Sequence, residues 1–182
     1  MDSLRGKLIV ASPAISDPNF RRSVVLIAEH GPEGAMGVVL DRISEATAGE
    51  VVGSLAWLVG DDAPVFVGGP VATTSVTVLA EFRDPAQAGL LIGDDLGFIP
   101  AHSDDEAVLA AAVGRARIFA GHAGWAPGQL EDELEDDGWI VAEADREDCF
   151  TSDPGGLWET VVRRQGAGFT LIATMPPDPT LN

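Results

Sequence analysis

The chain has 182 residues, 46% of them hydrophobic, which is enough for one compact domain with a sizeable buried core. Its 11 basic and 29 acidic residues give a formal net charge of −18, so the chain repels nucleic-acid phosphates and anionic lipid headgroups. We therefore predict no direct binding of nucleic acid or membranes, and a partner that is a protein or a small molecule.

Apolar runs at the start of the chain predict three adjacent strands. Residues 7–11 form a short first strand, and residues 23–30 form a continuous apolar run, which is typical of a strand covered on both faces. The Gly-Pro-Glu-Gly turn at residues 31–34 leads into a partner strand at residues 35–42. We therefore predict a β-hairpin in this part of the chain.

The remaining strands and helices follow from shorter patterns. Further strands are predicted at residues 63–67, 75–80, 89–100 (two short pieces), 116–122, 139–144 and 169–173. Helical spacing predicts helices at residues 47–59, 103–113, 127–137 and 153–164. Hairpins mixed with about four short helices, without a regular βαβ repeat, indicate an α+β or mixed α/β fold. We expect one domain over residues 1–182 with a loosely ordered tail at residues 175–182.

Several helix ends carry recognisable signals. Two helix starts have the capping-box pattern, formed by Thr47 with Glu50 and by Ser103 with Glu106. Pro127 occupies a first helical position, and Gly138 suits a left-handed stop. The last helix is the clearest, because Asp153 and Pro154 open it and Gly166 follows its basic last turn.

Cysteine content and hydropathy predict a cytoplasmic protein. Its single cysteine, Cys149, forms no intrachain disulfide, which suits a reducing compartment. The apolar run at residues 8–11 is too short for a secretory signal, and no run approaches the ~20 residues that span a bilayer.

Known catalytic signatures are absent from the sequence, but isolated candidate groups remain. There is no nucleophile elbow, zinc-binding helix or phosphate-binding loop of the common enzyme families. The 3 histidines fall at strand ends or in loops, where sites tend to assemble. If the fold gathers them, these groups would form an acid–base pair or a metal site: His30, His102 and His122 with Asp17, Glu33 and Asp41. Ordinary hydrogen-bonding histidines are the alternative.

The most informative stretch is GHAGWAPGQ, at residues 121–129. Its glycines permit tight backbone geometry, and amide groups at the start of the following helix would accept an anion beside the face of Trp125. Gln129 would reach the same point with its side-chain amide. Alternatively, Trp125 caps the core and Gln129 satisfies loop carbonyls.

These residues also carry a family resemblance. The segments LIVASPAISDPNFRRSVVLIAEHGPEGAMGVVLDR, PVFVGGPV and GHAGWAPGQLEDEL…GW resemble the AlgH/YqgE family of bacterial proteins, over about residues 6–166. The matching positions are Asp17, Phe20, Ser23, His30, Gly34, Gly37, Gly68, Gly69, Pro70, Gly121, Gly124, Trp125, Gly128, Gln129, Leu130, Glu133 and Trp139. Asp41 departs from the asparagine that members usually have there, which counts against a mechanism needing a neutral amide.

The resemblance implies a single cytosolic domain with a mostly antiparallel, curled, partly barrel-like sheet flanked by helices. It implies no established molecular activity, and the family name comes from a proposed role in regulating alginate gene expression.

We predict a non-catalytic binding or regulatory module that acts through a protein or small-ligand partner, with a possible indirect role in transcriptional regulation. Its expected binding surface joins the hairpin tip, the Gly-Gly-Pro turn and the 121–129 loop. The residues expected to form it are His30, Glu33, Gly34, Gly68, Gly69, His122, Gly124, Trp125, Gly128, Gln129 and Glu133. We assign no catalytic residue, metal or cofactor. The alternative is a metal-assisted or acid–base enzyme that uses His30, Glu33, His122 and Glu133.

Overall fold

The computed structural model of the protein describes residues 2–100 and 106–174. Ser103, the expected start of the second helix, and His102 lie outside the described residues, as does the tail at residues 175–182. The described chain forms a mixed α+β domain around a 10-stranded sheet, which is mostly antiparallel and does not close into a barrel.

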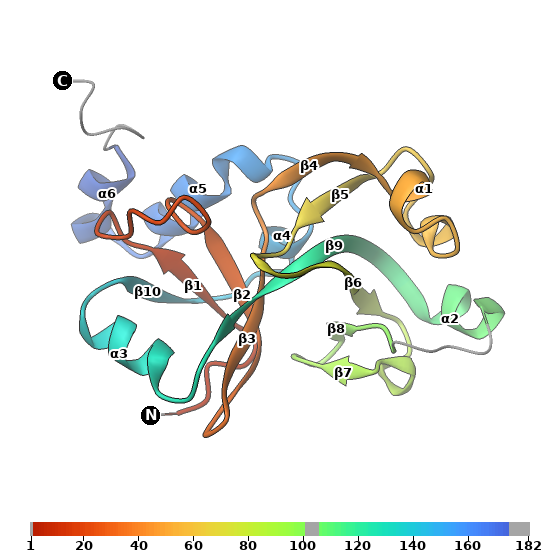
Figure 1. Cartoon of the computed structure of the whole chain (residues 1–182), viewed down its shortest axis with the longest axis horizontal. Helices are drawn as coiled ribbons and strands as arrows, with labels where there is room; N and C mark the ends of the chain where they lie inside the picture. Colours follow the sequence, from red (N-terminus) through yellow and green to blue (C-terminus); the bar gives the residue numbers. More distant parts are fainter. Residues whose placement is uncertain (1, 101–105, 175–182) are drawn as a thin grey trace.

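One half of the sheet has the strand order β10-β1-β2-β3-β9, with antiparallel neighbours throughout. These strands are β1 (Lys7–Ala11), β2 (Val24–Gly31), β3 (Gly34–Val39), β9 (Val113–Trp125) and β10 (Trp139–Glu143). The predicted hairpin is therefore confirmed as β2 and β3. Figure 1 shows β9 as a long bent strand that runs from this half of the sheet into the other.

The other half of the sheet is built along β9. There, β6 (Val71–Phe82) pairs antiparallel with β9 and with β8 (Leu96–Phe98), and β8 pairs with the short β7 (Leu90–Leu91). A separate hairpin of β4 (Ile43–Thr47) and β5 (Pro64–Val67) joins β9 through β5, which runs parallel to it. This parallel contact is the exception in an otherwise antiparallel sheet.

Short helices connect and cover the strands. They are α1 (Ala48–Val51), α2 (Glu106–Ala112), α3 (Gln129–Glu135), α4 (Arg146–Cys149), α5 (Leu157–Arg164) and α6 (Ala167–Ala173). Single 3₁₀ turns lie at η1 (Ala56–Leu58), η2 (Pro85–Gln87) and η3 (Pro154–Gly156).

Two predicted elements are wrong. Residues 169–173, predicted as a strand, belong to helix α6, because Phe169, Ile172 and Ala173 pack together onto the core next to α5. Their i, i+3, i+4 spacing is helical, and a short apolar run alone does not distinguish the two conformations. The helix predicted over residues 47–59 is broken into α1 and η1, which fits the low helix propensity of its glycines.

The helix-end signals are confirmed at two starts. Thr47 and Glu50 form the capping box of α1. The Asp153 side chain accepts a hydrogen bond from the Gly156 amide, and Pro154 opens the 3₁₀ turn that leads into α5. Helix α3 differs, because it begins at Gln129 rather than at Pro127, and the left-handed residue at its end is Asp137 (φ 56°) rather than Gly138.

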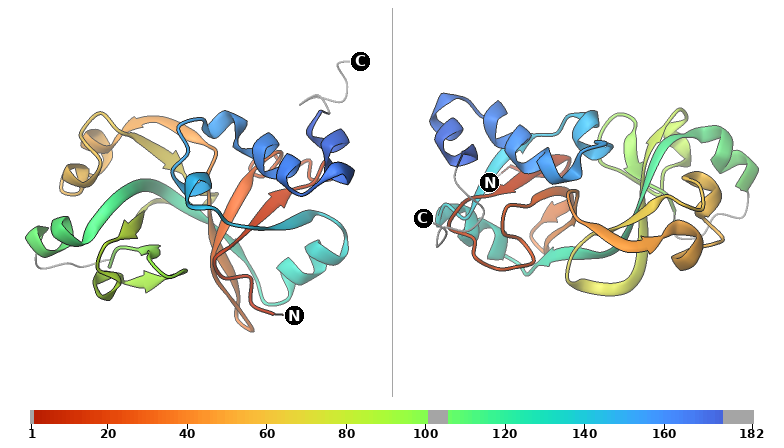
Figure 2. Two further views of the ribbon diagram at one scale, coloured as in Figure 1. Left: turned by 180° about the vertical axis from the view of Figure 1, so that it is seen from behind. Right: turned by 90° about the horizontal axis from the view of Figure 1, so that it is seen from above.

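Strand β2 is buried on both faces, as its continuous apolar run predicted, and so are its neighbours β1 and β3. On one face Leu8, Val10 and Leu26 pack against α5 and α6. On the other, Ile9 and Val25 pack in a cluster with residues of α3. Figures 1 and 2 show α5 and α6 on one side of these strands and α3 on the other. Each face of this half of the sheet is therefore covered by its own hydrophobic cluster, one with α5 and α6 and the other with α3.

Candidate functional site

The hairpin tip, the Gly-Gly-Pro turn and the 121–129 segment meet on β9, as the sequence predicted. Ala35 of the hairpin pairs with Trp125, and Val71, just after the turn, pairs with His122. Gly34 (φ 114°) and Gly69 (φ 152°) are required at these crossings, because a Cβ there would overlap the backbone of Trp125 and His122, respectively. Glycine therefore lets three chain segments pass in direct backbone contact.

Trp125 is a core residue in this arrangement. Its side chain packs against Phe20 and Trp139, with ring centroids 6.0 Å away in both cases, and the residue is 6% exposed. One carboxylate oxygen of Glu133, Oε2, accepts hydrogen bonds from the indole nitrogens of Trp125 (2.9 Å) and Trp139 (2.7 Å). Of the two alternatives for Trp125, the contacts favour the core.

Gln129 and Gly128 hold the start of α3. The Gln129 side chain accepts a hydrogen bond from the Ala126 amide (3.0 Å) and donates one to Glu133 Oε1 (2.9 Å). Gly128 occupies the N-cap position in the left-handed conformation (φ 79°). The Ala126 amide, just before the predicted helix start, and the Gln129 amide, in its first turn, are thus bonded within the protein.

His30 and His122 lie on opposite faces of the sheet. The His30 side chain is 4% exposed, accepts a hydrogen bond at Nδ1 from the Leu4 amide (3.0 Å) and contacts Glu131 Oε1 through Nε2 (3.1 Å). Because Nδ1 accepts, Nε2 carries the proton and donates to Glu131. His122 precedes Ala123 and Trp125 on β9, so strand alternation directs its side chain away from the face of Trp125 and α3.

Part of the predicted surface does form a hollow. His30, Glu33, Gly34 and Trp125 line a depression of about 470 Å³, together with residues of the N-terminal segment and of β2 and β3; we call it the hairpin hollow. Gly69 lines a different depression, and the remaining predicted residues line neither. Among residues 2–100 and 106–174, no group of three or more His, Cys, Asp or Glu side chains is placed to hold a metal ion.

Asp41 lies in that second depression, of about 570 Å³, which we call the Asp41 hollow. Its carboxylate accepts a hydrogen bond from the Val24 amide (3.2 Å). Burial raises the pKa of Asp41 to about 6, against the smaller opposing effects of this hydrogen bond and of the charge on Arg42. The carboxyl group is thus partly protonated in mildly acidic conditions.

A third cavity, of about 490 Å³, was not predicted from the sequence. It lies between the paired strands β4 and β5, the first half of β9 and the segment that follows α4; we call it the Arg117 cavity. Its lining consists of Ile43, Leu58, Val59, Ala63, Pro64, Phe66, Gly114, Arg115, Ala116, Arg117, Ile118, Phe150, Thr151, Ser152 and Pro154. Most of these side chains are apolar, and its cations come from β9.

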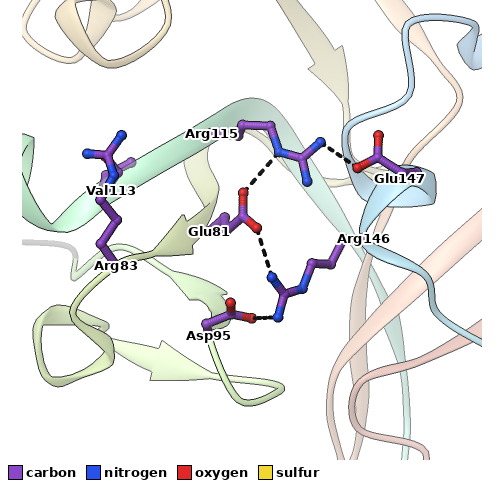
Figure 3. Close-up of polar contacts among 7 residues, drawn as sticks. All are labelled: Glu81, Arg83, Asp95, Val113, Arg115, Arg146 and Glu147. Carbon is purple, nitrogen blue, oxygen red and sulfur yellow. Dashed lines mark hydrogen bonds and ion pairs between the residues drawn. The ribbon is translucent and has the colours of Figure 1, made fainter.

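Arg115 is neutralised by carboxylates of the protein. Its Nε contacts Glu81 (3.0 Å) and its Nη1 contacts Glu147 (2.8 Å), as Figure 3 shows. Arg146 bridges Glu81 (3.1 Å) to Asp95 (2.7 Å) in the same network. The hydrogen bond from Arg115 lowers the pKa of Glu81, and the two carboxylates raise the pKa of Arg115.

Arg117 differs from Arg115 although it lies two residues away on β9. Its guanidinium carbon is 4.2 Å from the centroid of the Phe66 ring, and Nη2 donates to the Thr151 carbonyl oxygen (2.6 Å). Its Nη1 is buried, and within the described chain it has no hydrogen-bond partner. Burial lowers the pKa of Arg117 to about 10. The cavity is therefore lined by a partly desolvated cation, and one nitrogen of this cation, Nη1, is buried without a hydrogen-bond partner in the described chain.

The sequence carried a signal for this cavity. Arg115 and Arg117 are separated by one residue in an apolar strand, so strand alternation places both side chains on the same face. Only the fold brings Phe66 and Thr151 to that face, because these residues are distant along the chain.

These features define an α+β domain with strand crossings that require glycine and a cavity lined by a half-buried arginine. The chain belongs to the AlgH-like family, whose sequence profile matches residues 8–170. It is 43% identical to a UPF0301 protein of Streptomyces coelicolor, over 100% of this chain and 97% of the relative. It is 40% identical to a UPF0301 protein of Mycobacterium tuberculosis, over 97% of this chain and 90% of the relative.

Solved structures agree with this assignment. A crystal structure of a Corynebacterium diphtheriae protein superposes with a TM-score of 0.85 at 31% identity, covering 96% of this chain and 93% of the other. The solution structure of the AlgH protein from Pseudomonas aeruginosa superposes with a TM-score of 0.72 at 30% identity, covering 96% and 95%. None of the helices in the described part of the chain has the length and apolar character that a membrane span requires.

Proposed function

We propose that this AlgH-like protein is a non-catalytic cytoplasmic module that binds a small ligand in the Arg117 cavity. The observation that carries the proposal is the buried Nη1 of Arg117, which has no partner in the described chain although the sequence contains 29 acidic residues. A buried donor left unsatisfied costs about 1–3 kcal/mol, and more when it is charged. Such a cost is typical of groups that serve binding or catalysis.

The non-catalytic part of the proposal is supported by the candidate acid–base groups. His30 and Glu133 are occupied by structural hydrogen bonds, and His122 lies on the other face of the sheet from His30. No observation favours the alternative of a metal-assisted or acid–base enzyme. We propose that any regulatory role, including an indirect one in transcription, follows from ligand occupancy rather than from contact with nucleic acid.

A thermal-shift screen of small metabolites tests the cavity as the ligand site. Ala63→Leu narrows the cavity, and Ala14→Leu, at an exposed position, is the matched control. A ligand at 100 times its Kd stabilises the fold by about 2.7 kcal/mol, which is readily detected. We expect hits that stabilise the wild type and the Ala14→Leu control but not Ala63→Leu. A screen without hits, or hits that stabilise all three proteins equally, would contradict the proposal.

We propose that a protein partner binds at the hairpin hollow, which is the part of the sequence-predicted surface that forms a depression. The hollow brings exposed Glu33 together with His30, Gly34 and Trp125. A photo-crosslinking residue at Glu33 should give a discrete adduct in cells. The same residue at exposed Asp62, in the turn before β5, should not. Identical adduct patterns at the two positions would remove this surface from the proposal.

A further inference from the structure

We infer that the ligand of the Arg117 cavity is a small monocarboxylic acid with an apolar body. The inference rests on the proposed function, because it names the chemical class of ligand for the same cavity. Three features support it: the charge available, the unpartnered Nη1 of the guanidinium group and the lining of the cavity.

The cavity offers one uncompensated positive charge. Arg115, its other cation, already contacts Glu81 and Glu147. A ligand with one negative charge therefore neutralises Arg117. A polyphosphate or dicarboxylate would add further negative charge, which no described cation of the cavity offsets. It would also be repelled by Glu147 of α4, which contacts Arg115 in the lining.

The contacts of Arg117 restrict how an anion approaches. One face of the guanidinium group lies over the Phe66 ring, and Nη2 is bonded to the Thr151 carbonyl oxygen. Nη1 remains, and it is buried. A ligand carboxylate oxygen that displaces the atoms covering Nη1 would satisfy this donor with a short charge-assisted hydrogen bond, which is strong in a desolvated site.

The lining favours an apolar body on the ligand. Side chains of β4, β5 and η1, together with Phe150, contribute apolar walls to the cavity that Arg117 also lines. Ile43, which also lines the cavity, is 53% exposed, so an apolar ligand there would remove it from water. A volume of about 490 Å³ suits a small metabolite, because ligand pockets range over ~300–1,000 Å³.

Isothermal titration calorimetry with matched probes tests this inference. The probes are hexanoate, hexanamide, phenylacetate, phenylacetamide, acetate and inorganic phosphate, at constant ionic strength. We expect hexanoate or phenylacetate to bind at least about 10-fold more tightly than its amide, since a charge-assisted hydrogen bond is lost in the amide. Acetate, without an apolar body, and phosphate should bind weakly or not at all.

Variants assign the selectivity to Arg117. Arg117→Gln should weaken acid binding about 10-fold or more and leave amide binding unchanged. Arg163→Gln removes the same charge from an exposed position on α5, where Arg163 contacts Glu159. This control variant should bind the acids as tightly as the wild type does. If Arg117→Gln does not fold, the comparison of acid with amide in the wild type decides alone.

The outcomes separate the inference from the proposed function. Equal binding of acid and amide, or phosphate binding as tightly as hexanoate, would overturn the monocarboxylate inference and leave the cavity as a ligand site. Failure of every acid, while the metabolite screen yields other cavity ligands, would have the same meaning. If neither the probes nor the screen yields a ligand, both fail.

Discussion

Two ionisable residues that line cavities, Asp41 and Arg117, are partly removed from water in the folded protein. Burial raises the pKa of Asp41 and lowers that of Arg117, so in each case the fold disfavours the charged form. By contrast, Asp148 is more deeply buried but contacts Arg164, and this hydrogen bond raises the pKa of Arg164. Asp41 and Arg117 each line a cavity of the described chain.

Asp41→Asn tests the consequence for stability. Because the pKa of Asp41 rises from 3.8 to about 6 on folding, its protonated form is favoured in the fold and stability falls as the pH rises through about 4–6. Asparagine keeps an oxygen for the Val24 amide and carries no charge. The variant should therefore be more stable than the wild type by about 1–3 kcal/mol at pH 8, at 1.36 kcal/mol per pKa unit.

Urea denaturation at pH 5, 6.5 and 8 measures this difference above the sequence pI of about 4.2. The advantage of Asp41→Asn should grow over that range. A variant that is less stable at pH 8, or whose advantage does not change with pH, would show that the Asp41 carboxylate is not penalised by burial.

Residue patterns predicted which segments meet but not which side chains stay accessible. Trp125, Gln129 and Glu133 were expected at one surface. Glu133 does contact the other two, but its carboxylate satisfies the nitrogens of two indole rings. The second of these nitrogens belongs to Trp139, whose approach depends on the path of the chain after α3. Burial is a property of the packed molecule, so sequence alone left both interpretations of Trp125 open.

At the level of secondary structure, β9 organises the molecule because it pairs with β3, β5 and β6. Its core, residues 116–122, was predicted, but the observed strand is Val113–Trp125. The residues added after His122 pair with β3 of the hairpin, and Val113 at the other end pairs with Phe82 of β6. Those are long-range contacts, which local patterns do not encode.

A pair of glycine variants in the β2–β3 hairpin tests the crossing. A Cβ at Gly34 would overlap the Trp125 carbonyl oxygen in a left-handed conformation, whereas a Cβ at Gly31 meets no atom within 4 Å in the described structure. We expect Gly34→Ala to lower the free energy of unfolding by about 3 kcal/mol or more, and Gly31→Ala to change it by less than about 1 kcal/mol. Similar denaturation midpoints for the two variants would rule out a tight crossing at Gly34.

Helix α6 can be tested by replacing the exposed Gly168, whose Cβ position is open in the described structure. In a helix, Gly168→Ala should raise stability by about 0.5 kcal/mol, since alanine has the higher helix propensity. A strand at residues 169–173 would gain nothing of this kind. Thermal unfolding of the variant that matches or falls below the wild type would count against the helix.

Across the whole molecule, negative charge dominates, and five of the 11 basic residues contact carboxylates in the described chain. Arg115, Arg146, Arg163, Arg164 and Lys7 all contact carboxylates, so they form no free basic stripe for phosphate binding. We expect no shift of duplex DNA or RNA in gel assays even at low salt, where electrostatic binding is strongest. A shift that disappears as salt is added would indicate a basic surface and would contradict the proposal of indirect regulation.

The overall fold class followed from sequence, because alternation and helical spacing are local signals, whereas the Arg117 cavity did not. Its walls come from β4, β5, β9 and the segment after α4, which are separated by many residues along the chain. The central claim is that this cavity, rather than the surface around Trp125, holds the small ligand.

Methyl-detected NMR during a titration with hexanoate tests that claim most directly, because it reports where a ligand lies. Binding in the cavity predicts saturable shifts at Ile43, Leu58, Val59 and Ile118, which line it, with the methyl groups of Ile9 and Leu130 in the cluster beside Trp125 unchanged. Saturable shifts at Ile9 and Leu130, with the cavity methyl groups unmoved, would contradict the account.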